Sequence, residues 1–299
     1  MQDFAGKIAV VTGGGTGMGR ELVVQLAAAG AHVSMCDVSE PNMAETASMA
    51  RAAATSDVRV TTHTADVADE AAMLVFRDEV LSDQGTEHVN LLFNNAGLSG
   101  GGSLFTDSRE SWDRCFDVCF HGVRYGTLAF LDALVAADEA RIVNTSSVNG
   151  FWASIGPDRP HTAYSAAKFA VRGFTEALMT DLAVNAPHVT ASVVMPGHIG
   201  TRIVSNSVEF GARTMTDQER ELAAEADRLF HELAPMTAMD AATVILDEVR
   251  AGRWRILVGD DAHQLDEAVR ANPEGAYDPG FESTLFSELR AANAARQPD

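Results

Sequence analysis

Short apolar segments alternate with helical segments along most of this chain. The first apolar segment, Lys7–Thr12, is rich in β-branched residues and runs into a glycine cluster, after which apolar residues recur at helical spacing up to Gly30. Five further strand-like segments follow, with the sequences AHVSMCD, VRVTTHTAD, VNLLFNNAG, ARIVNTSS and HVTASVVMPG. Strands that alternate with helices predict an α/β fold, with a parallel sheet covered on both faces.

The second half of the chain supplies longer helices. Helical stretches at about 110–136 and 162–185 flank the fifth strand, and segment 199–235 is less regular. A last helix is expected to begin at Thr237, which pairs with Asp240 as in a capping box, and WRILVG gives a seventh strand.

The domain organisation follows from these elements. No internal repeat and no linker divides the chain, so we expect a single domain over residues 1–259, with a lid region at about 199–235. Residues 260–299 contain Pro273 and Pro279 and are expected to form a partly ordered C-terminal extension.

Charge and cysteine content narrow the class of protein. The chain has 42 acidic against 22 basic residues, so it would repel the phosphate backbone of a nucleic acid. Cys36, Cys115 and Cys119 show no spacing typical of disulfides or zinc sites, and the histidines show no paired ligand spacing, so we expect a cytoplasmic protein without metal. No apolar leader is present and no apolar run approaches the roughly 20 residues that span a bilayer, so no membrane partner is expected.

The segment TGGGTGMG, Thr12–Gly19, lies at the first strand-to-helix turn. Glycine lets the backbone turn tightly and approach a pyrophosphate, while the N–H groups and dipole of the helix N-terminus favour negative charge. We therefore predict a nucleotide site here, with contacts from Gly13, Gly15, Thr16, Gly17 and Met18.

Asp37 ends the second strand, where a carboxylate accepts hydrogen bonds from the ribose hydroxyls of an adenosine. It would repel a 2′-phosphate, and neither Thr16 nor Val38 offers the positive charge that such a phosphate needs. NAD is therefore expected rather than NADP. Asp66 and Val67, after the third strand, are candidates for the adenine edge, although an aspartate at either strand end can also be only a turn or helix cap.

The segment YSAAK places Tyr164 and Lys168 four residues apart, on one face of a helix. A phenol with a reference pKa of about 10 is a weak base, but a cation near 4 Å contributes roughly 4 kcal/mol at an effective dielectric of 20. Ser147 ends the preceding strand, at the sheet edge that carries ligands. Its hydroxyl either holds a substrate oxygen near Tyr164 or is only a turn residue.

These elements, in this order and together with NNAG at Asn94–Gly97 and PGHIGT at Pro196–Thr201, resemble the short-chain dehydrogenase/reductase family over about residues 4–259. The resemblance implies a Rossmann-type, doubly wound sheet of seven parallel strands, a nicotinamide cofactor, and hydride transfer between an alcohol and a carbonyl. It also implies cofactor contacts from Asn94, Ala96, Gly97, Pro196, Gly197, Ile199 and Thr201.

The resemblance also assigns catalytic roles. Ser147 would orient the substrate oxygen, and Tyr164 would act as general acid/base. Lys168 would lower the pKa of the tyrosine and bind the nicotinamide ribose.

Cys119 departs from the family pattern. Trp112 and Gly122 keep the usual spacing, and Cys119 falls where the family usually carries an asparagine that is thought to hold a water in a proton relay. A thiol is a weak donor and a weak acceptor. Either the relay is modified in an active enzyme, or the protein has lost the reaction. A reactive thiol is not expected, because the helix offers no adjacent cation.

The substrate region is expected to be apolar. The segment FWASIGPDRP predicts an apolar wall, and its apolar side chains join others from neighbouring loops. The residues concerned are Phe151, Trp152, Ile155, Leu98, Val204, Phe210 and Met215. We predict a medium-sized hydrophobic secondary alcohol or ketone as substrate. His161 and His198 are candidate substrate contacts, whereas His121 is expected to be structural.

Two other functions remain open: a non-catalytic NAD-binding regulatory protein and an NADP-dependent carbonyl reductase. The two long helices are the surface through which the resembling family usually pairs. A homodimer or homotetramer is therefore expected.

Overall fold

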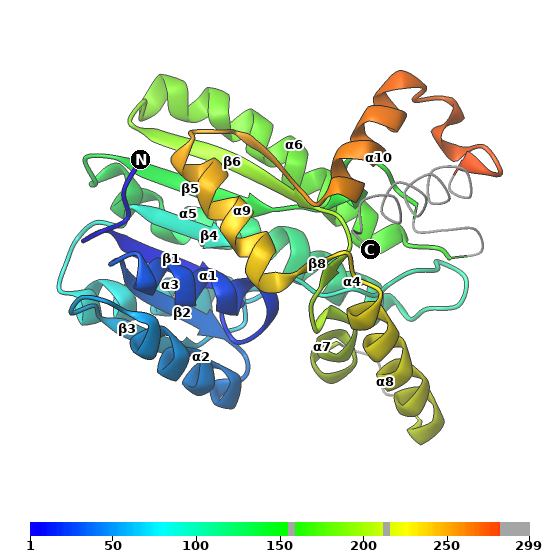
Figure 1. The fold of residues 1–299 in the computed structure, drawn as a ribbon, viewed down its shortest axis with the longest axis horizontal. Coiled ribbons are helices and arrows are strands. Elements are labelled where there is room, and N and C mark those ends of the chain that lie inside the picture. Colours follow the sequence, from blue (N-terminus) through cyan, green and yellow to red (C-terminus); the bar gives the residue numbers. More distant parts are fainter. Residues whose placement is uncertain (155–158, 212–215, 282–299) are drawn as a thin grey trace, which may run out of the picture.

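The computed structural model describes residues 1–154, 159–211 and 216–281, and its centre is a sheet of seven strands in the order β3-β2-β1-β4-β5-β6-β9 (Figure 1). All six strand pairs are parallel. The strands are β1 (Ile8–Thr12), β2 (His32–Asp37), β3 (Val60–Thr64), β4 (Leu91–Asn94), β5 (Ala140–Thr145), β6 (Val189–Pro196) and β9 (Arg255–Val258). The predicted α/β fold with a doubly wound, seven-stranded parallel sheet is confirmed.

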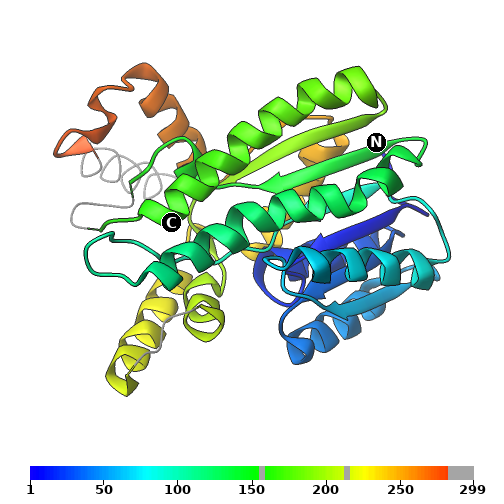
Figure 2. The same cartoon turned by 180° about the vertical axis from the view of Figure 1, so that it is seen from behind.

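Helices cover both faces of the sheet (Figures 1 and 2), and central strands such as β1 and β5 are buried on both sides. The helices of one face are α1 (Gly17–Ala28), α2 (Glu40–Ala53) and α9 (Ala238–Arg250). Those of the other are α3 (Glu70–Gln84), α5 (Gly122–Val135) and α6 (Thr162–Asn185). The strand order reverses between β1 and β4, which opens a crevice at their carboxyl ends.

The stretch at about 110–136, expected to be one helix, has an irregular middle. It consists of α4 (Arg109–Phe116), a π-helical turn η1 (Asp117–His121) that contains Cys119, and α5. By length and composition alone the helical run Arg109–Val135 could cross a membrane, and 56% of its apolar window is buried in this protein. It packs here against the sheet and α6.

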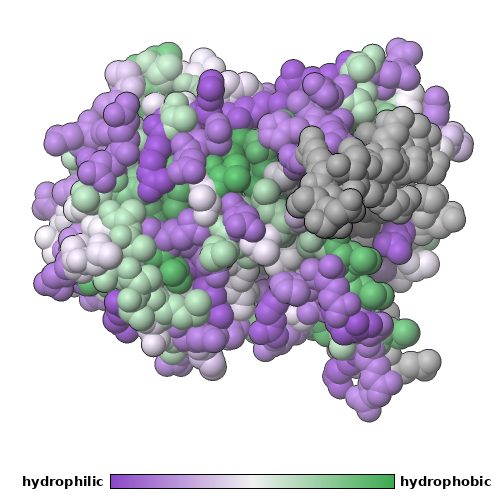
Figure 3. All heavy atoms as spheres, viewed as in Figure 1, coloured by the Kyte–Doolittle hydropathy of each residue, from purple (hydrophilic) through white to green (hydrophobic). Residues whose placement is uncertain are grey.

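The lid region, expected to be irregular, is mostly helical. It contains β7 (Ile199–Gly200), α7 (Ile203–Phe210), α8 (Asp217–Glu232) and β8 (Met236–Thr237), and β7 pairs with β8. Its helices were missed because they bury little apolar surface. Arg228 bonds Glu225 and Glu232 along α8, and such pairs support an exposed helix. The lid region projects from the body of the protein, and its surface carries both apolar and polar side chains (Figures 1 and 3).

The C-terminal extension folds back onto the segment that follows β5. It forms α10 (Asp260–Ala271) and a short 3₁₀ helix, η3 (Gly275–Tyr277). The Trp152 indole N–H donates to the Ala276 carbonyl at 2.8 Å, and the Ala153 N–H donates to the Tyr277 hydroxyl at 3.0 Å. The predicted substrate wall at Phe151 and Trp152 is therefore wrong, because these side chains pack into the core beneath the extension. Ile155 and Met215 lie outside the described residues.

We expect Trp152→Phe to loosen this extension while keeping the sheet folded. The phenyl ring keeps most of the buried apolar area but leaves the Ala276 carbonyl without its donor, a loss of about 1–3 kcal/mol in the free energy of unfolding. Denaturant unfolding would measure the loss, and limited proteolysis would show earlier cleavage after Gly259. Trp254→Phe, at a side chain that is 43% exposed, is the matched control and should change neither measurement.

Candidate active site

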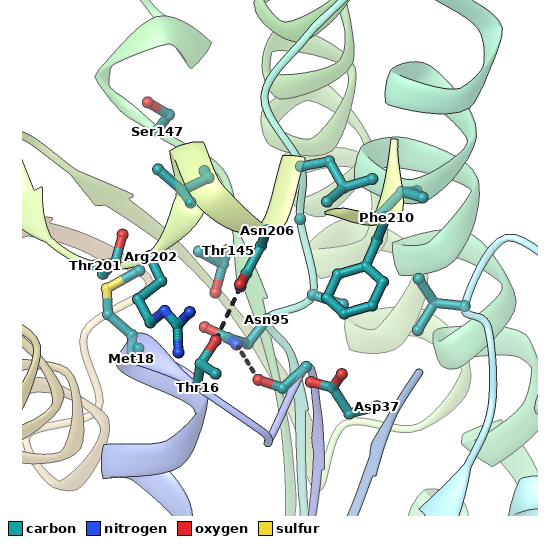
Figure 4. A pocket seen from close by; sticks show the side chains of 18 of the residues that line it. Thr16, Met18, Asp37, Asn95, Thr145, Ser147, Thr201, Arg202, Asn206 and Phe210 are labelled. Carbon is teal, nitrogen blue, oxygen red and sulfur yellow. Dashed lines mark hydrogen bonds between the residues drawn. The ribbon is translucent and has the colours of Figure 1, made fainter. Parts of the chain in front are cut away.

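A cavity lies at the crevice between β1 and β4 (Figure 4). One side of it is the turn from β1 into α1. Gly13 has a positive φ of 66°, and a Cβ at this position would lie 2.8 Å from the Cα of Ala96. A Cβ on Gly19 would overlap the carbonyl oxygen of Gly13. Both positions therefore require glycine, and the turn is a backbone cradle of the kind that a phosphate approaches closely.

The start of α1 adds favourable electrostatics to this turn. The helix begins at Gly17, which has a φ of 55°, and its first turn carries no acidic side chain. The unpaired N–H groups and the helix dipole favour an anion here. Thr16, Gly17 and Met18 line the cavity together with Gly13, as predicted. This set of residues fits the pyrophosphate of a dinucleotide.

Asp37 ends β2 and lines the same cavity. Its two oxygens accept the backbone N–H groups of Gly15 and Ser39, each at 3.0 Å. Gly15, a predicted cofactor contact, does not line the cavity and instead ties Asp37 to the glycine turn. Each carboxylate oxygen keeps a further lone pair, so Asp37 retains the capacity to accept two ribose hydroxyls.

Asp66 and Val67 also line the cavity. Asp66 accepts the Ala68 N–H at 3.0 Å and pairs with Arg114 of α4 at 2.7 Å. The sequence left open whether Asp66 caps a turn or faces the cofactor. In the structure it caps a turn and also lines the cavity. Arg114 was not predicted, because its partner lies 48 residues away in the sequence.

The two asparagines of the NNAG segment occupy different surroundings. Asn94, a predicted cofactor contact, does not line the cavity, because it is buried and donates to Thr127 and Asn144 at 3.1 and 2.9 Å. Asn95, which was not predicted, lines the cavity and donates to the Thr12 carbonyl. Alternation along an extended chain sends successive side chains to opposite faces, and this signal would have identified Asn95.

The three predicted catalytic side chains meet at one wall of the cavity. Ser147 follows β5, while Tyr164 and Lys168 lie one turn apart on α6. The Lys168 ammonium is 2% exposed, donates to the Thr145 carbonyl at 2.9 Å, and lies 5.4 Å from the centre of the Tyr164 ring. The Ser147 hydroxyl accepts the Asn149 N–H at 3.1 Å, which fixes its orientation. The arrangement presents a hydroxyl, a phenol and a cation to one ligand.

Burial raises the pKa of the Tyr164 phenol above its usual value. A thiolate at Cys119 would raise it further, and a hydrogen bond with Ser147 acts in the opposite direction. The lowering of this pKa by Lys168, which the resemblance implies, stays a prediction. The phenol is therefore the stable form of Tyr164 here.

Cys119 lies beside this group and is fully buried. Its sulfur is 3.1 Å from the Leu98 carbonyl oxygen. A hydrogen bond from Cys115, one helical turn earlier, and the Lys168 cation lower the pKa of Cys119, although burial opposes them. The absence of a nearby cation, predicted from the sequence, is wrong. A Cβ on Gly97 would lie 3.5 Å from the Lys168 nitrogen and 3.8 Å from the Cys119 sulfur, so Gly97 separates these two groups.

Neither histidine that was predicted to touch substrate lines the cavity. The His161 ring stacks on the Tyr164 ring at 4.6 Å, and burial lowers the pKa of His161 to about 4, so this ring is neutral at pH 7. His198 bonds to the Phe230 carbonyl of α8 at 2.7 Å. His121 packs among aromatic rings that include Phe116, as its predicted structural role requires.

The remaining predicted contacts also line the cavity. They are Ala96, Gly97, Pro196, Gly197, Ile199 and Thr201. The Asp261 carboxylate, from the C-terminal extension, accepts the His198 N–H at 2.6 Å next to Gly197. Four of the lining residues that were not predicted come from the lid: Arg202, Ile203, Asn206 and Phe230. Their side chains follow no motif, and the fold of the lid alone brings them here.

Comparison with known proteins agrees with this geometry. The sequence model of the short chain dehydrogenase family matches residues 7–211. SadH of Mycobacterium tuberculosis, named as an oxidoreductase, is 36% identical over 270 residues, which cover 90% of this chain and 92% of SadH. Human epidermal retinol dehydrogenase 2 is 31% identical over 201 residues, which cover 67% of this chain and 62% of that protein.

A solved structure is similar over the whole chain. A short chain dehydrogenase/reductase from Burkholderia phymatum, crystallised in complex with NAD, superposes with a TM-score of 0.76 at 29% identity, and the match covers 100% of this chain and 98% of that protein. The fold, the glycine cradle and the matched sequence thus agree, and the chain belongs to the short-chain dehydrogenase/reductase family of oxidoreductases, which use a nicotinamide cofactor.

Proposed function

We propose that this protein is an NAD-dependent dehydrogenase that interconverts a hydrophobic secondary alcohol and its ketone. The observation that carries the proposal is the convergence of Ser147, Tyr164 and Lys168 on the cavity whose other side is the glycine turn and Asp37. A non-catalytic binding protein would not need a phenol, a hydroxyl and a buried ammonium at one wall.

The residues present can perform the proton chemistry of this reaction. NAD supplies the hydride acceptor when it is bound. The Ser147 hydroxyl, oriented by Asn149, is placed to hold the substrate oxygen. The Tyr164 phenolate takes the proton of an alcohol during oxidation, and the Tyr164 phenol gives a proton to the ketone oxygen during reduction. Lys168 supplies a buried positive charge that favours the phenolate once Tyr164 has lost its proton.

The cavity walls support an apolar substrate. Leu98, Ile203 and Phe210 line the cofactor cavity. A second cavity adjoins it, shares Leu98 and Arg114, and is lined by Val204, Val208, Leu222 and other small or apolar side chains of α7 and α8. Retinol, in the name of one relative, is an apolar primary alcohol, so it supports the apolar character of the proposed substrate and not the secondary position of its hydroxyl.

We also propose that the protein pairs with itself through α5 and α6. Leu128 on α5 and Phe169 and Val184 on α6 are large apolar side chains that are 47%, 41% and 76% exposed. Burial of such side chains in a dimer stabilises it. Light scattering at the mass of a monomer would contradict this.

The overall test is a screen with NAD over diverse alcohols, read by the absorbance of the reduced cofactor. Turnover of apolar secondary alcohols is expected. Turnover of polyols alone would contradict the proposed substrate class, and NAD binding without any turnover would identify a non-catalytic protein.

Tyr164→Phe should abolish most turnover while NAD affinity stays nearly unchanged. The phenyl ring keeps the packing against His161 but has no proton to exchange, so we expect a loss of about a hundred-fold or more in kcat. Steady-state kinetics and cofactor titration would measure the two effects. Tyr125→Phe removes a phenol elsewhere and should leave kcat unchanged. Retained turnover in Tyr164→Phe would mean that another group carries the proton.

Asp37→Ala should relax the preference for NAD over NADP. The carboxylate repels a 2′-phosphate and accepts hydrogen bonds from the ribose hydroxyls. Its loss therefore removes both the repulsion of NADP and the hydrogen bonds to NAD. The ratio of kcat/KM for the two cofactors measures the change, with Asp57→Ala as a control for the loss of one negative charge. An unchanged ratio would show that the ribose is recognised elsewhere, and a wild type that prefers NADP would refute the choice of cofactor.

Cys119→Asn should move the pH profile of alcohol oxidation to lower pH. Oxidation needs a deprotonated Tyr164, and a negative Cys119 raises the pKa of that phenol, so a neutral amide lowers the pH at which the rate rises. Measurement of kcat against pH tests this, and Cys36→Ala, at a buried thiol of β2, should leave the profile in place. A profile that stays in place in Cys119→Asn would show that Cys119 is uncharged over this range.

The same variant reports on the surroundings of Cys119. An amide whose polar groups find no partner costs about 1–3 kcal/mol on burial. Denaturant unfolding with an unchanged midpoint would indicate that the site accepts a hydrogen-bonding group, and a strong loss of stability would indicate apolar core. If the wild type is inactive and the variant turns over alcohols, then the natural protein has lost the reaction.

A further inference from the structure

The charged side chains that line the cofactor cavity differ in whether they have a partner. Among the described residues, the charged side chains that line it are Asp37, Asp66, Arg114, Lys168 and Arg202. Arg114 is paired with Asp66 at 2.7 Å, and Lys168 is held by the Thr145 carbonyl at 2.9 Å beneath the catalytic wall. Arg202 forms no ion pair within the part of the chain that the structure describes. Its charge is therefore available to a ligand.

Arg202 lies at the point where the lid touches the glycine turn. Its neighbour Thr201 packs against Gly17, since a Cβ on Gly17 would lie 3.3 Å from the Cβ of Thr201. One turn further along α7, the Asn206 amide donates to the Thr16 hydroxyl at 2.9 Å. These two contacts hold the start of the lid against the first residues of α1, with Arg202 between them in the chain. Figure 4 shows the guanidinium directed toward Thr16, into the cavity.

We propose that Arg202 binds the pyrophosphate of the dinucleotide from the lid side, opposite the N–H groups at the start of α1. The inference rests on the proposed cofactor and assigns to it a contact outside the glycine turn. A guanidinium presents paired N–H donors that match phosphate oxygens. With Arg202 on one side and the α1 N-terminus on the other, the pyrophosphate would connect the lid to the body of the protein.

The overall charge of the protein makes such a cation important. The chain has a net charge of −20, and Asp37 and Asp66 lie in the same cavity, so an anionic ligand meets repulsion from the protein as a whole and from two carboxylates at the site. The helix dipole supplies only a partial positive charge. The full positive charge of Arg202, on the lid side, offsets this repulsion at the pyrophosphate, where the ligand carries its negative charges.

The lid position also links this contact to the substrate cavity. Val204, Ser207 and Val208 of α7 line the second cavity, and they lie on the same helix as Asn206. The Ser207 hydroxyl accepts the Ser99 N–H at 2.8 Å, which fixes one wall of that cavity. An anion held by Arg202 therefore stabilises the helix that shapes the apolar site.

The test is binding of NADH and of cofactor fragments to the full chain, without substrate. NADH fluorescence gives its Kd, and displacement of NADH gives the affinities of ADP-ribose, which carries the pyrophosphate, and of adenosine, which carries no phosphate. We expect Arg202→Gln to weaken NADH and ADP-ribose by about ten-fold or more, as for the loss of a hydrogen bond to a charged group, and to leave adenosine unchanged. Arg202→Lys should recover part of the loss.

Arg220→Gln is the matched control, because Arg220 is an exposed arginine of α8, paired with Asp217, that does not line the cavity. It should bind all three ligands as the wild type does. Raising the salt concentration should weaken ADP-ribose binding more in the wild type than in Arg202→Gln.

Three results would overturn the inference. They are equal ADP-ribose affinity in Arg202→Gln and wild type, an equal loss for adenosine, and a loss for NADPH larger than that for NADH, which would assign Arg202 to the 2′-phosphate. A wild type that binds neither NADH nor NADPH would instead refute the proposed function, and the inference with it.

Discussion

The close approach of Gly13, Gly19 and Ala96 is the contact on which the rest of the site depends. It lets β1 turn directly into α1 at the point where the strand order reverses, so the start of the helix and the end of β4 face one crevice. Any side chain at either glycine would push these elements apart. Asp37, the catalytic wall and the lid are all arranged around the space that this turn leaves.

Three buried titratable groups lie together at the opposite wall, and two of them line the cavity. Tyr164, Lys168 and Cys119 come from two helices, and each is almost fully removed from water. In such surroundings the charge of one group strongly changes the proton affinity of the next. The π-helical turn at Asp117–His121 places Cys119 in this group, and Gly97 leaves room between its sulfur and Lys168. Cys119 therefore lies close to the catalytic side chains even though it does not line the cavity.

The lid is held differently from the sheet. Its helices bury little apolar surface and are joined to the body by single polar contacts, such as the bonds of Asn206 to Thr16 and of His198 to Phe230. The C-terminal extension, in contrast, is bound by a buried tryptophan and by the ion pair of Arg255 with Asp266. Elements with few apolar contacts open at lower free-energy cost, so motion in this protein is expected first in the lid.

The sequence by itself determined the fold class, the strands and the glycine turn, because hydrophobic periodicity and the need for glycine are local properties. It also named Tyr164 and Lys168, four residues apart on one helix, and Ser147 at the end of the preceding strand, as candidate catalytic residues, and all three line the cavity. Only the tertiary structure decided that Asn95 rather than Asn94 lines the cavity, that Trp152 is core, that Lys168 lies near Cys119, and that Arg202 enters from the lid. These outcomes depend on contacts between side chains that are far apart in the sequence, and a local sequence pattern does not predict such contacts.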